Sequence, residues 1–85
     1  MQLSRKEILE KLQDIMISIN DDQREKFEAS TEETRLVEDL GLTSVGMLYL
    51  VIIVEESFQI KFEDVGIAEF DTVAKVIDYI EEKTK

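Results

Sequence analysis

The 85-residue sequence contains no cysteine, no histidine, no proline and no tryptophan. Without cysteine it can form no disulfide, thiolate metal site or thiol nucleophile, and without histidine it lacks the commonest general base of enzymes. Carboxylates are plentiful, but no nucleophile is paired with a base, and the stretch Asn20-Asp21-Asp22 lacks the glycine and the alternating carboxylates of an EF-hand loop. We therefore expect a protein that holds no metal ion and is not an enzyme.

Long apolar runs are also missing. The longest, from Met47 to Val54, has eight residues, whereas a membrane-spanning helix needs about 20. The first residues alternate charged and apolar side chains and lack the apolar region of a signal peptide. We expect one cytoplasmic domain over residues 1–85, without membrane contact.

Basic residues are half as frequent as acidic ones. The sequence has 10 lysines and arginines against 20 aspartates and glutamates, a net charge of −10. A chain of this charge is repelled by nucleic acids and anionic membranes, and is attracted to basic protein surfaces. We expect protein partners rather than nucleic acid, and a monomer.

The N-terminal part of the chain predicts one helix and a long loop. Ser4 and Glu7 form an S-x-x-E capping box. Apolar residues then recur every three to four positions, which predicts a helix at about residues 5–19. Residues 20–39 are mostly polar and are interpreted as a long loop that could include a short turn of helix. A loop of this length in a compact domain is often functional.

The middle of the chain predicts a second helix, from about Ser44 to Ser57. Gly41 allows a tight turn before it, and Thr43 or Ser44 can cap its first turn. The β-branched run Val51–Val54 is also compatible with a strand. We favour a helix because no second strand-like run exists to pair with it.

The C-terminal part predicts a connector and two further helical segments. Residues 58–62 are expected to be extended, and residues 63–68 to form one short helical turn. Asp71 is the expected N-cap of a last amphipathic helix at about residues 72–83. The predicted fold is all-α, a small four-helix bundle of three main helices and one short helix, with a long loop between helices 1 and 2.

The segment Glu38-Asp39-Leu40-Gly41-Leu42-Thr43-Ser44-Val45 resembles the attachment motif of acyl carrier proteins, E-D-L-G-x-D-S-L. The resemblance continues over nearly the whole chain. Further matches to the second and last helices of that family are Leu50, Val51, Glu55, Glu56 and Phe58, followed by Phe70-Asp71-Thr72-Val73 and Ile77-Asp78-Tyr79-Ile80.

The resemblance implies a covalent cofactor. In this family a phosphopantetheinyl transferase attaches 4′-phosphopantetheine to the serine of the motif, which is Ser44 here. The thiol at the end of this arm carries acyl groups as thioesters to acyl-loading and acyl-processing enzymes of fatty-acid, polyketide or related specialised biosynthesis. Helix capping is the alternative role of Ser44, and the two roles are compatible.

Three positions depart from the family pattern. Thr43 replaces the aspartate before the serine, Gly46 replaces an acidic residue, and Tyr49 replaces an acidic residue on the outer face of the helix. These changes indicate a specialised carrier whose docking surface is more apolar than that of a housekeeping carrier, although Tyr49 could instead pack against the first loop. The expected partner-binding residues are Asp39, Thr43, Val45, Gly46, Met47, Tyr49, Glu55 and Glu56.

Two questions stay open at this point. The chain could be an aminoacyl or peptidyl carrier, or a carrier-like interaction domain that is never modified, which the loss of the aspartate at position 43 favours. An acyl chain could also be sheltered between the helices, or the same residues could simply fill the core. The candidates for lining such a space are Leu48, Ile52, Phe62, Ile67 and Val73.

Overall fold

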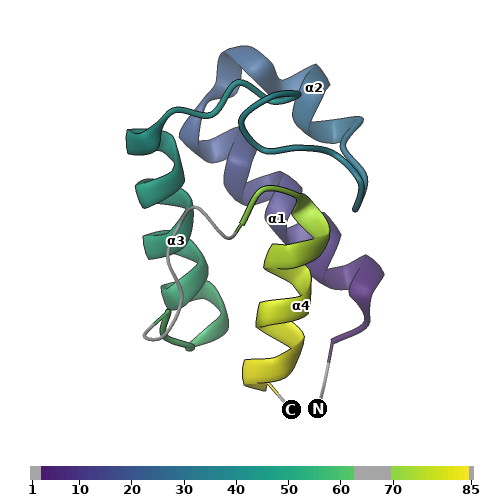
Figure 1. Ribbon diagram of the computed structural model, residues 1–85, viewed down its shortest axis with the longest axis vertical. Helices are drawn as coiled ribbons and strands as arrows, with labels where there is room; N and C mark the ends of the chain where they lie inside the picture. The colour runs from purple at the N-terminus through teal and green to yellow at the C-terminus, as the bar shows by residue number, and fades with distance from the viewer. Residues whose placement is uncertain (1–2, 63–69, 85) are drawn as a thin grey trace.

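The computed structural model describes residues 3–62 and 70–84, and its described part is helical without β-strands. The helices span Arg5–Ile19 (α1), Arg24–Glu28 (α2), Ser44–Phe58 (α3) and Val73–Thr84 (α4), and a 3-10 turn, η1, covers Asp21–Gln23. α1 contacts α2, α3 and α4, while α2 and the long loop close one end of the molecule (Figure 1). The predicted all-α bundle is confirmed; the short helical turn expected at residues 63–68 lies outside the described residues.

One face of each helix supplies the core. In α1 the residues that recur at helical spacing are buried, because their side chains share one side of the cylinder. Phe27 from the short α2 is fully buried among them, and its burial contributes about 2 kcal/mol. The buried residues of the three long helices are Ile8, Leu12, Ile15, Met16, Met47, Leu50, Val54, Val73, Val76, Ile77 and Ile80.

The predicted starts of the first and last helices can be compared with the structure. The capping box of α1 is present, because the Glu7 N–H donates to the Ser4 hydroxyl and the Ser4 N–H donates to the Glu7 carboxylate. At α4 the Thr72 hydroxyl accepts from the Lys75 N–H at 3.4 Å. The prediction of Asp71 as N-cap was therefore wrong by one residue: its carboxylate lies 3.4 Å from the Lys75 ammonium instead.

The loop between α1 and α3 is held against the start of α4 by backbone hydrogen bonds. The Leu36 N–H donates to the Asp71 carbonyl at 3.0 Å, and the Val73 N–H donates to the Thr34 carbonyl at 3.0 Å. A third bond runs from the Ala74 N–H to the Glu32 carbonyl at 2.8 Å. The loop predicted at residues 20–39 therefore differs from the structure in its first part, which forms η1 and α2. Its later part is a loop, ordered by partners about 40 residues further along the chain.

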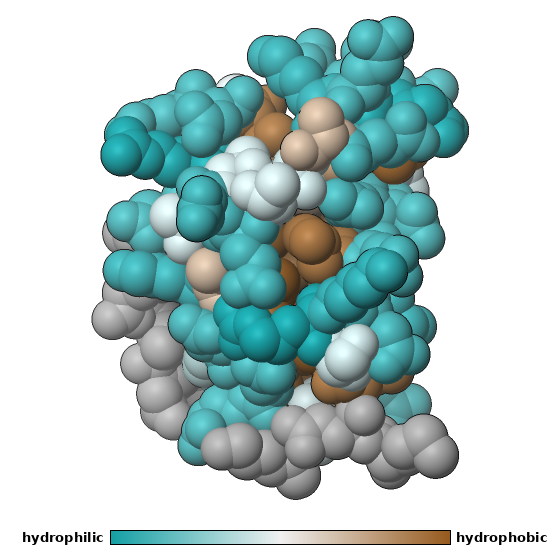
Figure 2. All heavy atoms as spheres, turned by 90° about the vertical axis from the view of Figure 1, so that its right-hand side faces the viewer, coloured by the Kyte–Doolittle hydropathy of each residue, from teal (hydrophilic) through white to brown (hydrophobic). Residues whose placement is uncertain are grey.

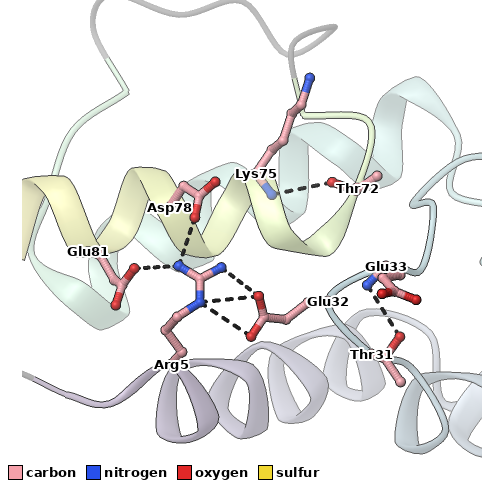
Figure 3. Close-up of polar contacts among 8 residues, drawn as sticks. All are labelled: Arg5, Thr31, Glu32, Glu33, Thr72, Lys75, Asp78 and Glu81. Atoms are coloured by element: carbon pink, nitrogen blue, oxygen red, sulfur yellow. Dashed lines mark hydrogen bonds and ion pairs between the residues drawn. The ribbon is translucent and has the colours of Figure 1, made fainter.

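One arginine joins three segments of the chain (Figure 3). Arg5 of α1 donates from Nη2 to Glu32 in the loop at 2.6 Å, and from Nη1 to Asp78 of α4 at 2.7 Å. Nη1 also pairs with Glu81, one turn further along α4. The hydrogen bonds to Glu32 and Asp78 raise the pKa of the guanidinium above its ordinary value. We call this group the Arg5 cluster.

The surface differs from one side of the molecule to the other. Figure 2 shows that the face at the right of Figure 1 is mostly hydrophilic, with apolar atoms visible only between polar ones. The outer side of α3 is different, since Val45, Leu48, Tyr49 and Ile52 are each about half exposed. In the described part of the chain, no helix combines the length and the apolar character needed to cross a membrane.

Candidate functional site

Ser44 occupies the first helical position of α3. Thr43 precedes it with an extended backbone (φ −87°, ψ 174°), and the Thr43 hydroxyl accepts from the Gly46 N–H at 3.1 Å. The cap is therefore Thr43, because a capping residue needs a non-helical backbone. Of the two predicted caps, Thr43 is confirmed and Ser44 is not: the Ser44 side chain is exposed, and its hydroxyl makes no hydrogen bond to another described residue.

The turn before Ser44 is fixed from both sides. Gly41 has φ +70°, a left-handed conformation that glycine adopts without strain. Leu40 and Leu42 on either side of it are buried and anchor the turn to the core. Asp39, expected to contact partners, accepts the Arg35 N–H at 2.9 Å through its carboxylate. Asp39 thus holds the turn in place, and its side chain is also exposed to solvent.

A groove of about 1010 Å³ opens beside Ser44. One wall comes from the turn that precedes α3, another from the first turn of α3, and a third from the residues just before α4. Its apolar lining offers a contact surface for hydrocarbon, and charged groups lie on the same walls. The lining residues are Arg35, Val37, Glu38, Leu42, Thr43, Ser44, Met47, Leu48, Phe70, Asp71 and Thr72.

The residues expected to shelter an acyl chain do not line one common space in the described part of the chain. Leu48 lines the groove, whereas Ile52 is half exposed on the outer side of α3 and does not line it. Val73 is buried in the core, and Phe62 packs in an aromatic cluster with Phe70 and Tyr79 at centroid distances of 4.6 to 5.6 Å. Ile67 lies outside the described residues.

The expected partner-binding residues of α3 divide into an outer and an inner group. Val45 and Tyr49 are 61% and 56% exposed, so Tyr49 is not buried against the first loop. Met47, however, is only 3% exposed. Its selection as a surface residue was wrong, because it lies three positions before Leu50 on the core side of the helix. Gly46 is half-buried.

The two glutamates at the end of α3 have different roles. The Glu55 carboxylate accepts the Phe62 N–H at 2.8 Å, and the Glu55 carbonyl accepts the Ile60 N–H at 3.1 Å. Glu55 therefore folds the connector back onto α3 and is half-buried there. Glu56 is exposed and remains available to a partner.

Arg35 is the residue of this site that the sequence analysis missed. It lines the groove and forms an ion pair with Glu38. The hydrogen bond and the charge of Glu38 raise the pKa of the Arg35 guanidinium above its ordinary value. A sequence signal was present, since Arg35 is the only basic residue between Lys26 and Lys61. Within the described residues, no three potential metal ligands gather into a site.

Comparisons with known proteins identify the family. Residues 7–80 match the family described as "Phosphopantetheine attachment site". The acyl carrier protein of Thermotoga maritima is 32% identical over 83 residues, which cover 94% of this chain and 95% of that protein. That of Caulobacter vibrioides is 35% identical over 78 residues, covering 92% and 96%. That of the Onion yellows phytoplasma is 44% identical over 54 residues, covering 64% and 71%.

These matches extend over most of the sequence and include the turn, the groove walls and α3. The cofactor of the chain is a covalently attached 4′-phosphopantetheine, and its partners include a phosphopantetheinyl transferase and acyl-processing enzymes. The chain is a carrier and not an enzyme. It belongs to the acyl carrier protein family, the carriers that bind phosphopantetheine.

Proposed function

We propose that Ser44 is the attachment residue, and that the chain, as a single-domain monomer, carries acyl intermediates of a specialised fatty-acid, polyketide or related pathway. The observation that supports this most directly is the Ser44 hydroxyl, which is exposed and makes no hydrogen bond to another described residue. A hydroxyl with no structural task can be modified without loss of a contact.

The surroundings of Ser44 fit the cofactor. Thr43 performs the capping, so modification of Ser44 leaves the start of α3 intact. Free N–H groups at a helix start favour an anion such as a phosphodiester. The groove supplies apolar side chains, among them Leu42 and Leu48, beside the attachment point. When bound, the cofactor supplies a terminal thiol that holds the cargo as a thioester.

The tether gives this chain its function without catalytic residues of its own. A flexible arm raises the effective concentration of the cargo at a partner's active site. The task of the protein is then to present Ser44 at a defined place and to offer a surface that partners recognise. The rigid turn at Gly41 and the cap at Thr43 serve the first need.

Intact mass measurement tests the attachment site. The unmodified chain is incubated with coenzyme A, Mg²⁺ and a broad-specificity phosphopantetheinyl transferase, in parallel with Ser44→Ala and Ser57→Ala. Ser57 is a matched control, because it is exposed in the last turn of the same helix. We expect a gain of one phosphopantetheine in the wild type and in Ser57→Ala, and none in Ser44→Ala. Modification of Ser44→Ala would contradict the proposal.

We also propose that partners dock on the outer face of α3, defined as Val45, Leu48, Tyr49 and Ile52. These positions have the spacing i, i+3, i+4 and i+7, so they form one continuous apolar strip. The helix has no charged residue before Glu55. Exposed apolar strips of this kind mark interaction sites, so the contact surface of a partner should be apolar there, with basic groups facing Glu56.

The docking surface is tested by titration with the phosphopantetheinyl transferase of the same host. A double change, Gly46→Asp with Tyr49→Glu, should weaken binding about tenfold or more, as is usual when a central apolar anchor is lost. The control places two acids elsewhere, Ser18→Glu with Ala29→Asp, and should bind like the wild type. Unchanged or tighter binding of the first variant would refute apolar docking.

The alternative of an interaction domain that is never modified was raised by Thr43, which takes the position of the aspartate in the family's motif. The match to the phosphopantetheine attachment family, which implies the covalent cofactor, argues against this alternative. The mass measurement tests it directly, because an interaction domain gains no phosphopantetheine even with a transferase from its own host.

A further inference from the structure

Arg35 brings the only positive charge to the groove beside Ser44, among the lining residues that the structure describes. The other charged residues of the lining are Glu38 and Asp71. In a chain with a net charge of −10, a single cationic side chain next to the attachment point is unusual, and its full charge can attract an anion in addition to the N–H groups at the start of α3.

The backbone of Arg35 is held firmly. Its N–H donates to the Asp39 carboxylate at 2.9 Å, and its carbonyl accepts from Asp39 and Leu40 at 3.0 and 3.1 Å. Arg35 also forms an antiparallel bridge with Thr72. The base of the side chain is thus fixed between two walls of the groove, so little backbone freedom remains to be lost when the side chain binds a ligand.

The guanidinium has donors to spare. Its Nη1 pairs with Glu38, whereas Nε and Nη2 form no hydrogen bond to another described residue, and the side chain is 60% exposed. A guanidinium presents five N–H donors in a planar fork that matches phosphate oxygens. Arg35 can therefore keep Glu38 as a partner and bind a second anion.

We infer that Arg35 is a binding residue for the phosphodiester of the arm on Ser44, and that it holds the first part of the arm against the groove. This inference rests on the proposed attachment at Ser44. Arg35 offsets the repulsion that a new negative charge meets beside Glu38 and Asp71. It also biases the arm toward the apolar lining at Leu42 and Leu48, instead of toward solvent.

The experiment compares each protein before and after attachment of phosphopantetheine. The variants are wild type, Arg35→Gln and the matched control Arg24→Gln. Arg24 is 57% exposed and pairs with Asp21 and Glu28, but it does not line the groove. Attachment should lower the melting temperature of Arg35→Gln by about 2–4 °C more than that of the other two, the size expected for one exposed charge contact in a domain of this length.

Two further measurements keep the inference open to refutation. Glu38→Gln removes the carboxylate that competes for Arg35. The change in melting temperature on attachment should therefore be more positive in this variant than in wild type. The ³¹P resonance of the phosphodiester should move in Arg35→Gln and stay in place in Arg24→Gln. Equal temperature shifts and equal ³¹P resonances in the two arginine variants would overturn the inference.

The source of the anion is tested by loading the arm with an uncharged acyl group or with one that ends in a carboxylate. We expect the effect of Arg35→Gln with the arm alone and with either cargo. An effect only with the carboxylate would place the anion on the cargo and overturn the assignment to the phosphodiester. If the wild-type chain gains no mass, both the proposed attachment at Ser44 and this inference are overturned. If the chain is modified but Arg35→Gln changes neither the melting temperature nor the ³¹P resonance, only this inference is overturned.

Discussion

Two glycines near Ser44 have opposite backbone requirements. Gly41 has φ +70°, and no atom beyond its two neighbours in the chain lies within 4 Å of the Cβ that a substitution would add. Gly46 lies within α3, and its added Cβ would meet Leu42 Cδ2 at 3.4 Å, an ordinary contact. The first glycine is therefore needed for its backbone conformation, while the second is not needed for the fold.

We expect Gly41→Ala and Gly46→Ala to change stability in opposite directions. Gly41→Ala should lower the free energy of unfolding by about 1–2 kcal/mol, because alanine is strained in the left-handed region. Gly46→Ala should leave it unchanged or raise it by up to about 1 kcal/mol, because alanine favours the helix. Urea unfolding of the apo chains measures both, and equal destabilisation would contradict the argument.

At the scale of the element, α3 begins at a cap that the sequence left open between two residues and ends at a residue that the sequence does not single out. Thr43 caps its start, while Gln59 closes its end in the left-handed conformation, with φ 55° and ψ 48°. Glycine is the usual residue at such an end, since it has no side chain to strain. Thr43 also occupies the place of the aspartate in the family's motif. This one residue therefore bears both on the start of α3 and on recognition by the phosphopantetheinyl transferase.

The end of α3 gives a stability prediction. Gln59→Gly should raise the free energy of unfolding by up to about 1 kcal/mol, because it relieves the left-handed strain. Ser57→Gly, two residues earlier and still helical, should lower it by about 1 kcal/mol. Thermal unfolding of the two variants distinguishes them, and a loss of stability in Gln59→Gly would contradict the argument that the left-handed backbone of Gln59 is strained.

The start of α3 gives a functional prediction. Thr43→Asp keeps a capping side chain, so stability should change by less than about 0.5 kcal/mol, whereas Thr43→Ala loses the bond to Gly46 and about 1 kcal/mol. If Thr43 limits recognition, Thr43→Asp should be modified faster by a broad-specificity transferase. The rate of mass gain measures this. A rate below that of wild type would show that the transferase does not favour the acid there.

At the scale of the whole molecule, two sets of contacts join segments that are far apart in sequence. The backbone bonds between residues 32–36 and 71–74 form one of them. The Arg5 cluster forms the other and connects α1, the loop and α4. The backbone bonds join two walls of the groove, because Asp71 belongs to its lining and the loop supplies Arg35 and Val37. The Arg5 cluster contains no residue of the lining and acts on the fold as a whole.

Arg5→Gln should destabilise the whole fold. It leaves Glu32, Asp78 and Glu81 close together without their cation, in a chain that is already strongly acidic. The Arg5 side chain is 35% exposed, so solvent screening limits the loss to about 1 kcal/mol, more than for an isolated surface pair. Arg24→Gln, with its two exposed partners, should lose less than about 0.5 kcal/mol.

Melting temperatures at low and high salt test the difference in stability loss between Arg5→Gln and Arg24→Gln, which should shrink with added salt. An equal loss in both variants would show that the Arg5 cluster contributes no more than a surface pair.

The sequence by itself determined the three long helices and the position of Ser44 at the start of one of them. Helical periodicity, the capping box at Ser4 and the motif around Gly41 are local patterns, and the energies that favour them arise between residues a few positions apart. The match to the carrier family covers residues 7–80 and so includes the motif around Gly41.

Only the tertiary structure decided what surrounds Ser44. The burial of Met47, the joining of Arg35 to Thr72 and the opening of the groove depend on contacts between segments far apart in the chain. The residue pattern within one segment does not show which distant segment it will contact. Even the choice of Thr43 over Ser44 as the cap depended on where the backbone leaves the turn, which the buried leucines at positions 40 and 42 set by packing into the core.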